Sequence, residues 1–426
     1  MPSTARTANV HQVSARSIRE RARMRTGPYV VAASALLSIG FLTAPARAQS
    51  APVADKGERK GTVMVRFGEG LSAQNADGSV GISLKTCVQV RGTAVETDDP
   101  SDASGDVQIR RLRLTIEGFA FRHRLTYKIQ LAGASLDLDP VAPLIVRDAY
   151  GNFALHRDLE VRAGQMKVPF GRQRVVSSGN LQMVDRSIVT SEFNLDRDVG
   201  LQALSTDLFG LGGHLGYNLG VFGGDGRGRV SGSYGLLYAA RIELRALGGT
   251  RAVELDEPDF SRSKVPRLAF GVSAAFNHKT DRKRSTLDSL FSTGAWASYA
   301  HTGFDSIFKF RGFSLTSEFF LRKAVDDTNI ALVDGKLRTD RAQSGYGGFL
   351  QSGYFLTESA EVTARLGGVY PFGDSNVGSR PTREVGGGLS YYFFKHALKL
   401  QADYFRLLGE GNSSRHQVRL QLQFAP

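Results

Sequence analysis

The chain has 426 residues, 54 Lys and Arg against 41 Asp and Glu, a formal charge of +13 and one cysteine. The single cysteine excludes an internal disulfide. No apolar stretch after residue 48 approaches the ~18–20 residues that a membrane-spanning helix needs, so a chain of this kind enters a membrane only with strands.

The N-terminus has the features of a secretory signal. An arginine-rich lead precedes an apolar run over 29–43, and an A-x-A cleavage site ends at Ala48. We therefore expect export and removal of residues 1–48, and Met24 is as good a start of translation as Met1. The removed part carries seven cations and one acid, so the remaining chain has a formal charge of only +7.

From residue 80 onward the hydrophobic period is two, which predicts β-strands. In the last of these strands Val418, Leu420, Leu422 and Phe424 alternate with Gln and Arg. The segments begin near residues 80, 107, 124, 147, 159, 198, 214, 234, 267, 304, 313, 344, 360, 384, 397 and 416. The pattern predicts an all-β domain over 80–426, preceded by an N-terminal periplasmic segment over 49–79.

The connections between the predicted strands alternate in length. Odd-numbered strands are followed by long connections, namely 92–106, 133–146, 166–197, 278–303, 323–343 and 371–383. Even-numbered strands are mostly followed by short ones, namely 118–123, 156–158, 312, 357–359 and 394–396. Short periplasmic turns, long extracellular loops and an even strand number are typical of outer-membrane barrels. The long connection 246–266 breaks the rule and has room for two further strands, which would raise the count from 16 to 18.

These features favour a transmembrane antiparallel β-barrel of about 16 strands. Aromatic residues gather at strand ends, as over 391–394, where interfacial girdles are expected. Closure of the sheet pairs every backbone amide inside a membrane, and a barrel of this size encloses an aqueous lumen. A large soluble sandwich has the same periodicity, but the export signal, the sorted connections and the aromatic end of the last strand weigh against it.

The fifth predicted strand leads into the longest connection, 166–197, which is rich in cations. Pro169 and Gly171 are suited to set a turn at its start, because proline fixes φ and glycine permits a positive φ. In a barrel of this size such a loop can fold inward and narrow the pore. We therefore expect an inward-folding loop after strand five.

Four stretches, RRLRLTIEG, DAYGNF, VRAGQMKVPFG and DRDVGLQAL, resemble successive signatures of the phosphate-selective porin O/P family. The similarity runs from about Val63 to the end, and G-Q-x-K-x-P-F-G is its most specific element. Two departures are the absence of a leucine-rich, coiled-coil-like segment after the signal and a final Pro426 in place of an aromatic.

The resemblance implies an outer-membrane porin of a Gram-negative bacterium that admits inorganic phosphate or other small anions by passive diffusion. It also implies a homotrimer, surrounded by outer-membrane lipid and lipopolysaccharide.

Cations on the lumen phase are the candidate pore residues. Guanidinium groups match oxyanion geometry and keep their charge, and conduction needs several weak sites rather than one tight site. The alternation and the loop give Arg111, Arg113, Lys128, Arg162, Lys167, Arg172, Arg241, Arg365 and Arg419. Among these we predict that Arg113, Lys128, Arg162, Lys167 and Arg172 form the constriction.

One alternative is that lumen cations merely pair with lumen acids, such as Glu117, Glu160, Glu243 and Asp403, and line a general, unselective pore. Another is a structural or adhesive barrel whose pore is shut. Arg110 falls on the lipid phase, so either it snorkels to the interface or the predicted register is off by one.

No catalytic motif emerges from the sequence. It contains no H-E-x-x-H, no Cys/His spacing for a metal and no G-x-S-x-G. We therefore expect no enzymatic activity, metal, cofactor or nucleic-acid partner.

Overall fold

The computed structural model describes residues 61–98, 103–141, 143–229, 234–248, 255–325, 328–373, 381–409 and 414–426. The predicted signal over 1–48, with both candidate start sites, lies outside the described residues. In the described part of the chain, no helix is long and apolar enough to cross a membrane.

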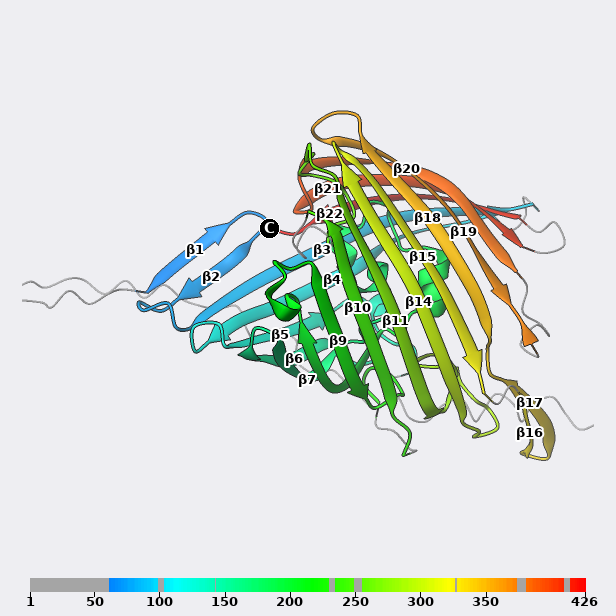
Figure 1. The fold of residues 1–426 in the computed structure, drawn as a ribbon. Coiled ribbons are helices and arrows are strands. Elements are labelled where there is room, and N and C mark those ends of the chain that lie inside the picture. Colours follow the sequence, from blue (N-terminus) through cyan, green and yellow to red (C-terminus); the bar gives the residue numbers. More distant parts are fainter. Residues whose placement is uncertain are drawn as a thin grey trace, which may run out of the picture. The chain divides into compact units, whose positions relative to one another are not determined.

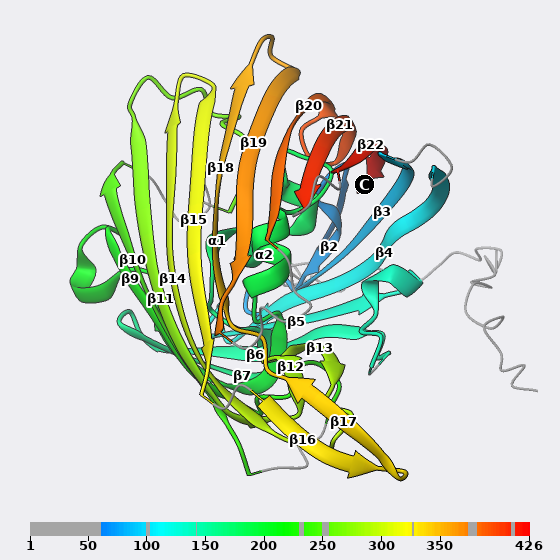
Figure 2. The same ribbon diagram turned by 90° about the vertical axis from the view of Figure 1, so that its right-hand side faces the viewer.

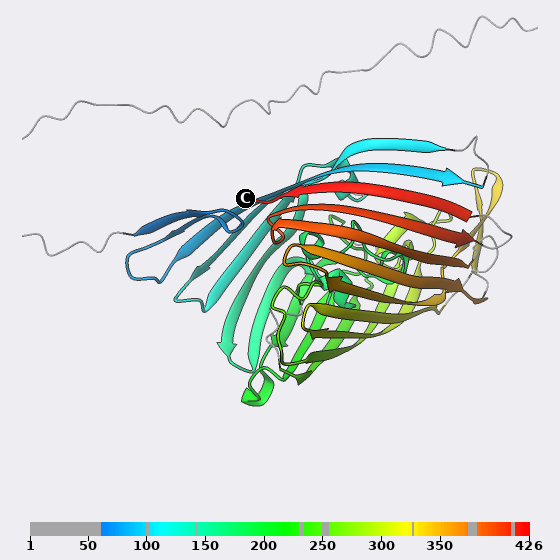
Figure 3. The same ribbon diagram turned by 90° about the horizontal axis from the view of Figure 1, so that it is seen from above.

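Sixteen antiparallel strands form a closed barrel, as predicted. The last strand closes the barrel by pairing with the first barrel strand, from Arg415 opposite Thr97 to Phe424 opposite Val88. Figure 1 shows the barrel, and in Figure 3 the red last strand runs beside the light-blue first barrel strand. The strands are β3 (Gly81–Thr97), β4 (Ser104–Ala120), β5 (Leu125–Ala132), β6 (Val146–His156), β7 (Leu159–Lys167), β8 (Arg197–Ser205), β9 (Leu215–Phe222), β10 (Leu237–Leu247), β11 (Arg267–Thr280), β14 (Ala297–Phe310), β15 (Phe313–Ala324), β18 (Gly345–Phe355), β19 (Ala360–Pro371), β20 (Thr382–Phe394), β21 (Leu398–Gly409) and β22 (Ser414–Phe424).

The strands lengthen at the expense of two predicted connections. β3 continues to Thr97 and β4 begins at Ser104, so most of the predicted long connection 92–106 is strand. The tenth strand, β14, begins at Ala297 rather than near residue 304. Strand ends beyond the apolar band need no strict alternation, because both of their faces meet water. The sequence period therefore ends before the strand does.

Other long connections carry their own small elements. One holds β12 (Arg282–Arg284) and β13 (Leu287–Leu290), and another holds the hairpin of β16 (Thr328–Val333) and β17 (Lys336–Arg341). The described residues 255–266 contain no strand, so the barrel count stays at 16.

Side chains alternate between the outside and the inside of the barrel. On β3, Val90 is 41% exposed on the outer face, whereas Gln89 and Arg91 point inward and are buried. Leu112 and Leu420 are likewise exposed on the outer face. This outer apolar surface is what a lipid-facing band requires, and the polar set lines the interior.

The loop between β7 and β8, residues 168–196, folds into the barrel. It contains α1 (Arg172–Val175), the 3-10 turn η3 (Ser178–Asn180) and α2 (Ile188–Phe193), which lie inside the ring of strands in Figure 2. Ser187 caps α2 by accepting a hydrogen bond from the Thr190 amide at 2.9 Å. We call residues 168–196 the inner loop.

A hydrophobic core anchors the inner loop to the wall. Val168, Phe170 and Phe193 of the loop pack with Phe320 of β15 and Phe349 of β18, and all five are buried. Gly171 has a φ of 70°, and a β-carbon there would lie 2.7 Å from the Phe320 ring. Both facts require glycine at this turn. The same core continues to Phe222 of β9, Leu237 of β10 and Ala275 of β11.

A second segment enters the lumen, from the connection between β10 and β11. Glu257 accepts hydrogen bonds from the Gln173 side chain at 3.0 Å and from the Gln182 amide at 2.8 Å. Lys309 of β14 donates to the carbonyls of Asp256 and Pro258. These bonds join the segment to both the inner loop and the wall.

A hairpin extends the wall at one end of the barrel. β1 (Thr62–Arg66) pairs with β2 (Gly70–Gln74), and β2 pairs with the beginning of β3, from Leu71 opposite Leu84 to Gln74 opposite Gly81. The hairpin therefore takes up the edge of β3 that β22 leaves free below Val88 (Figure 1). Residues 62–74, which fall in the predicted N-terminal segment 49–79, thus join the barrel sheet.

Candidate functional site

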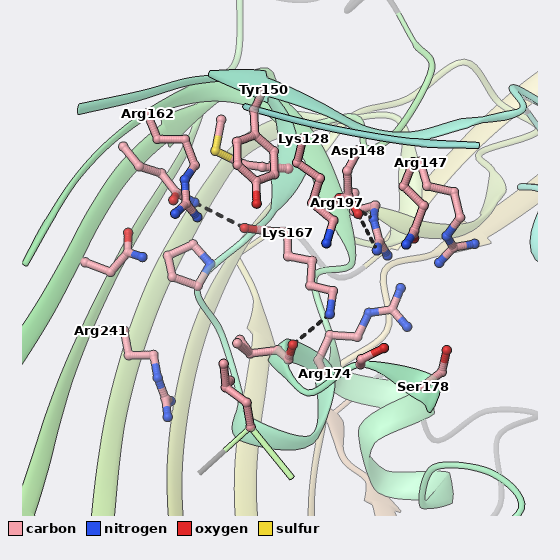
Figure 4. A pocket seen from close by; sticks show the side chains of 18 of the residues that line it. Lys128, Arg147, Asp148, Tyr150, Arg162, Lys167, Arg174, Ser178, Arg197 and Arg241 are labelled. Atoms are coloured by element: carbon pink, nitrogen blue, oxygen red, sulfur yellow. Dashed lines mark hydrogen bonds and ion pairs between the residues drawn. The ribbon is translucent and has the colours of Figure 1, made fainter. Parts of the chain in front are cut away.

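The inner loop and the wall formed by β4 to β10 enclose a cavity of about 470 Å³, which we call the cationic cavity. Figure 4 shows its side chains converging from the wall and the loop. Nine cationic side chains line it, against two acidic ones, Asp148 and Glu243. The cations are Arg113, Lys128, Arg147, Arg162, Lys167, Arg174, Arg186, Arg197 and Arg241. An excess of this size attracts anions into a low-dielectric space.

Two of these cations are held by backbone carbonyls of the inner loop. Lys167 donates from Nζ to the Val175 carbonyl at 2.7 Å and to the Val176 carbonyl at 3.3 Å. Arg186 donates to the carbonyls of Gln173 at 2.9 Å and Val176 at 2.8 Å. Within the described residues neither side chain forms an ion pair with a carboxylate. Carbonyl groups orient the two cations without cancelling their charge.

Other cations of the cavity share carboxylates. Arg197 binds Asp148 with two nitrogens, at 2.8 and 3.0 Å. Asp137, in the 3-10 turn η2 (Ser135–Asp137), accepts from Arg113 at 2.6 and 2.7 Å and lies 3.1 Å from Arg147. One carboxylate thus serves two guanidinium groups, so the pairing leaves net positive charge.

Two ionisable groups outside the strands, Arg186 and Asp137, keep their charges at neutral pH. Burial lowers the pKa of Arg186 to about 9, with the nearby Arg111 adding to the effect, so the guanidinium stays cationic. Burial alone would raise the pKa of Asp137, but the hydrogen-bonded Arg113 outweighs it and holds that pKa well below its usual value.

The structure brings together five of the nine predicted pore residues, which are Arg113, Lys128, Arg162, Lys167 and Arg241. The other four lie outside the cavity. Arg111 pairs with Asp185, Arg172 with Asp305, Arg365 with Glu384 and Arg419 with Asp403.

All four of these pairs lie where the inner loop meets the wall, since Asp403 accepts a hydrogen bond from the Val184 amide of the loop at 3.1 Å. Arg172 reaches β14 from the loop, and Arg111 reaches the loop from β4. Arg365 also donates to the Asp185 carbonyl of the loop at 3.0 Å. The alternation of apolar and polar residues predicts which side chains of a strand point into the barrel. It does not predict which side of the lumen a loop fills.

The predicted pairing of lumen cations with acids is seen in part. Lys128 pairs with Glu117, and Arg241 pairs with Glu243 at 3.0 Å. Glu160 instead accepts from the Asn152 side chain. These pairs coexist with the cationic excess of the cavity.

Two arginines escape the alternation because they sit at β-bulges. The β5–β6 register passes from Gln130 opposite Asp148 to Leu131 opposite Val146, so Arg147 has no partner in the ladder. Arg147 and Asp148 are consecutive, yet both are buried inside the barrel. A bulge turns an extra residue inward in this way.

Arg110 occupies the second bulge, between Gln89 opposite Arg111 and Val90 opposite Ile109. Its side chain donates to the Leu136 carbonyl at 3.0 Å and lies 3.7 Å from Asp185. Arg110 therefore does not snorkel, and the register shifts by one residue here. Arg174, Arg186 and Arg197 also line the cavity, and the sequence showed them only as cations within the long connection 166–197.

In the part of the chain that the structure describes, no group of three or more His, Cys, Asp or Glu side chains could hold a metal ion.

Comparisons with known proteins agree with the fold. The family model described as phosphate-selective porin O and P matches residues 88–425. No curated protein sequence matches the chain significantly.

Solved structures with the same fold include an anion-selective porin from Comamonas acidovorans, at 12% identity and a TM-score of 0.56, covering 82% of this chain and 100% of that one. A loop-deletion mutant of OmpT, an outer-membrane protein of Vibrio cholerae, gives 11% and 0.55, with the same coverage. The outer-membrane channel DcaP of Acinetobacter baumannii gives 13% and 0.51, covering 82% and 98%.

Proposed function

The chain belongs to the phosphate-selective porin O and P family and forms an outer-membrane anion channel, and we propose that the cationic cavity is the part that selects the anion. The supporting observation is the excess of nine cationic over two acidic lining side chains, with Lys167 and Arg186 held by carbonyls. The barrel end with the short turns faces the periplasm in this proposal.

Passage depends on exchange of hydration water for protein donors. An anion that enters the cavity loses part of its water shell, and N–H groups of the lining arginines and lysines replace it. Because the donors come from several strands and the loop, the anion moves between weak sites and is not trapped at one. The inner loop supplies one wall of this path, and β4 to β10 supply the other.

Several finer features belong to the same proposal. Inorganic phosphate or a related small anion is the cargo. Residues 1–48 are an export signal that is removed, and the barrel assembles as a homotrimer in contact with outer-membrane lipid and lipopolysaccharide. The resemblance to the family supports these points.

Single-channel recording in planar bilayers tests the function. In a KCl gradient we expect sustained conductance. We also expect a zero-current potential whose sign shows that chloride permeates more readily than potassium. Exchange of Lys167 and Arg186 for Ala together should move that potential toward zero. The control is Lys323→Ala, which removes a charge exposed at the end of β15. A silent barrel would instead favour a structural or adhesive role, and a potential near zero in the wild type would favour a general porin.

A further inference from the structure

A second cavity, of about 400 Å³, lies at the short-turn end of the barrel, and we call it the hairpin cavity. The inner faces of β1 and β2 contribute Thr62, Met64, Ser72 and Gln74 to its lining. Lys128, Tyr150 and Arg162 line both the hairpin cavity and the cationic cavity. The two spaces are therefore adjacent, with cations at the place where they meet.

Strand register explains why apolar and cationic groups share this space. One row of paired positions crosses six strands, and its members are Met64, Ser72, Ser83, Glu117, Lys128 and Tyr150. Side chains in one cross-strand row point to the same face of a sheet. Met64 on the hairpin thus faces the same interior as Lys128.

The neighbouring row adds an aromatic ring. Phe119 is opposite Gly81 on one side and opposite Thr126 on the other. A β-carbon on Gly81 would lie 2.4 Å from the Phe119 ring, so glycine there leaves the ring room to lie across β3. The ring also stacks on His123, with centroids 3.6 Å apart. Phe119 and Met64 are both apolar lining residues of the hairpin cavity.

Spacing relates this apolar surface to the cations. Lys128 is two residues beyond Thr126, so Phe119 and Lys128 are diagonal neighbours, about 7–8 Å apart. Arg162 lies farther along the row of Phe119 and Thr126, and its guanidinium carbon is 4.7 Å from the centre of the Tyr150 ring. A phosphate group at Lys128 would place an attached ring or short alkyl chain over Phe119.

We infer that the hairpin cavity accepts the apolar part of an organic phosphate whose charged group is held by Lys128 and Arg162. Aryl and alkyl phosphate monoesters are then cargo of the channel together with inorganic phosphate. A volume of about 400 Å³ falls within the range of ~300–1,000 Å³ that is usual for small-molecule sites. The inference rests on the proposed anion path, because the charged group must cross the cationic cavity.

Block of the chloride current tests the inference on the reconstituted full chain. Phenyl phosphate and methyl phosphate carry the same charged group and differ in the apolar part. We expect phenyl phosphate to block the wild type at a concentration about tenfold lower than methyl phosphate, since one ring loses contact with water. Met64→Gln should shrink that ratio about threefold and leave block by inorganic phosphate unchanged.

The matched control is Val65→Gln, because Val65 is adjacent to Met64 but points to the other face and is 78% exposed. It should leave the ratio at its wild-type value. Equal block by the two esters in the wild type, or the same shift in Val65→Gln as in Met64→Gln, would overturn the inference. Zero-current potentials in KCl separate the two proposals. A channel that prefers chloride but does not distinguish the esters contradicts only the hairpin-cavity site, whereas a channel without chloride preference contradicts the proposed function itself.

Discussion

Lys167 at the end of β7 lies directly opposite Arg197 at the start of β8, so two cations occupy one paired position of the sheet. Like charges at such positions are destabilising. Arg197 turns to Asp148 and Lys167 turns to the Val175 carbonyl, which separates the charges without neutralising both. An anion between them would offset the repulsion, and both side chains line the cationic cavity.

Loss of Lys167 should weaken anion preference. In Lys167→Ala we expect chloride-over-potassium selectivity to fall by about threefold to tenfold, because the variant loses one of the two cavity cations that pair with no carboxylate among the described residues. Reversal potentials in KCl gradients measure the change. Lys167→Arg is the control, since it keeps the charge, and it should preserve most of the selectivity. Equal loss in both variants would mean that Lys167 acts only through packing.

Loss of Asp148 should strengthen the binding of anions in the channel. Asp148→Asn keeps the shape of the side chain but removes the carboxylate that binds Arg197 with two nitrogens. We expect phosphate to block chloride current at a concentration severalfold lower than in the wild type. Asp403→Asn, which removes the partner of Arg419 outside the cavity, should leave the block unchanged. Weaker block in Asp148→Asn would contradict this role.

Gly171 should be required for a stable inner loop. Gly171→Ala places a β-carbon 2.7 Å from the Phe320 ring at a φ of 70°, so we expect a loss of about 1–3 kcal/mol in the free energy of unfolding. Gly213→Ala provides the comparison, because its φ is 80° but no atom lies within 4 Å of the added carbon. Thermal unfolding of both variants in detergent separates contact from backbone strain. A larger loss in Gly213→Ala would refute the contact argument.

Asp137 should stabilise the structure in a pH-dependent way. Its carboxylate has a pKa well below the ordinary value of about 3.9, so the stabilisation is complete above about pH 5 and declines as pH falls below 4 toward the folded-state pKa. Asp137→Asn should therefore unfold at a lower temperature than the wild type at pH 7. The difference should shrink at pH 3. A difference that is constant with pH would exclude titration of Asp137 as its source.

Strand positions could be predicted because the two faces of each strand meet different solvents. Leu420 is 54% exposed on the outer face and Gln421 is buried on the inner face, and the sequence alternates accordingly. Most predicted strand starts lie within three residues of those in the structure. A closed barrel then follows from the even strand number and the sorted connections.

The path of the loops could not be predicted from local pattern. Glu257 meets Gln173 and Gln182 through contacts between residues far apart in the chain, and no periodicity marks them. Arg147 was missed because a bulge breaks the alternation. Arg172 was predicted in the constriction because the sequence does not show which wall the loop approaches. Cation composition identified the loop, but the core around Phe320 determines which of its cations meet the cavity.

The apolar core of the inner loop reaches β9 to β11 as well as β15 and β18, so the loop fills part of the lumen. The cross-section that is open to ions is consequently smaller than a barrel of sixteen strands would enclose. Substitutions in that core should alter stability more than permeation, and substitutions of the cavity-lining cations on β4 to β10 should do the reverse. A change of cargo can therefore arise through the lining of the cavity while the core preserves the fold. Strand number alone is a poor guide to the conductance of the barrel.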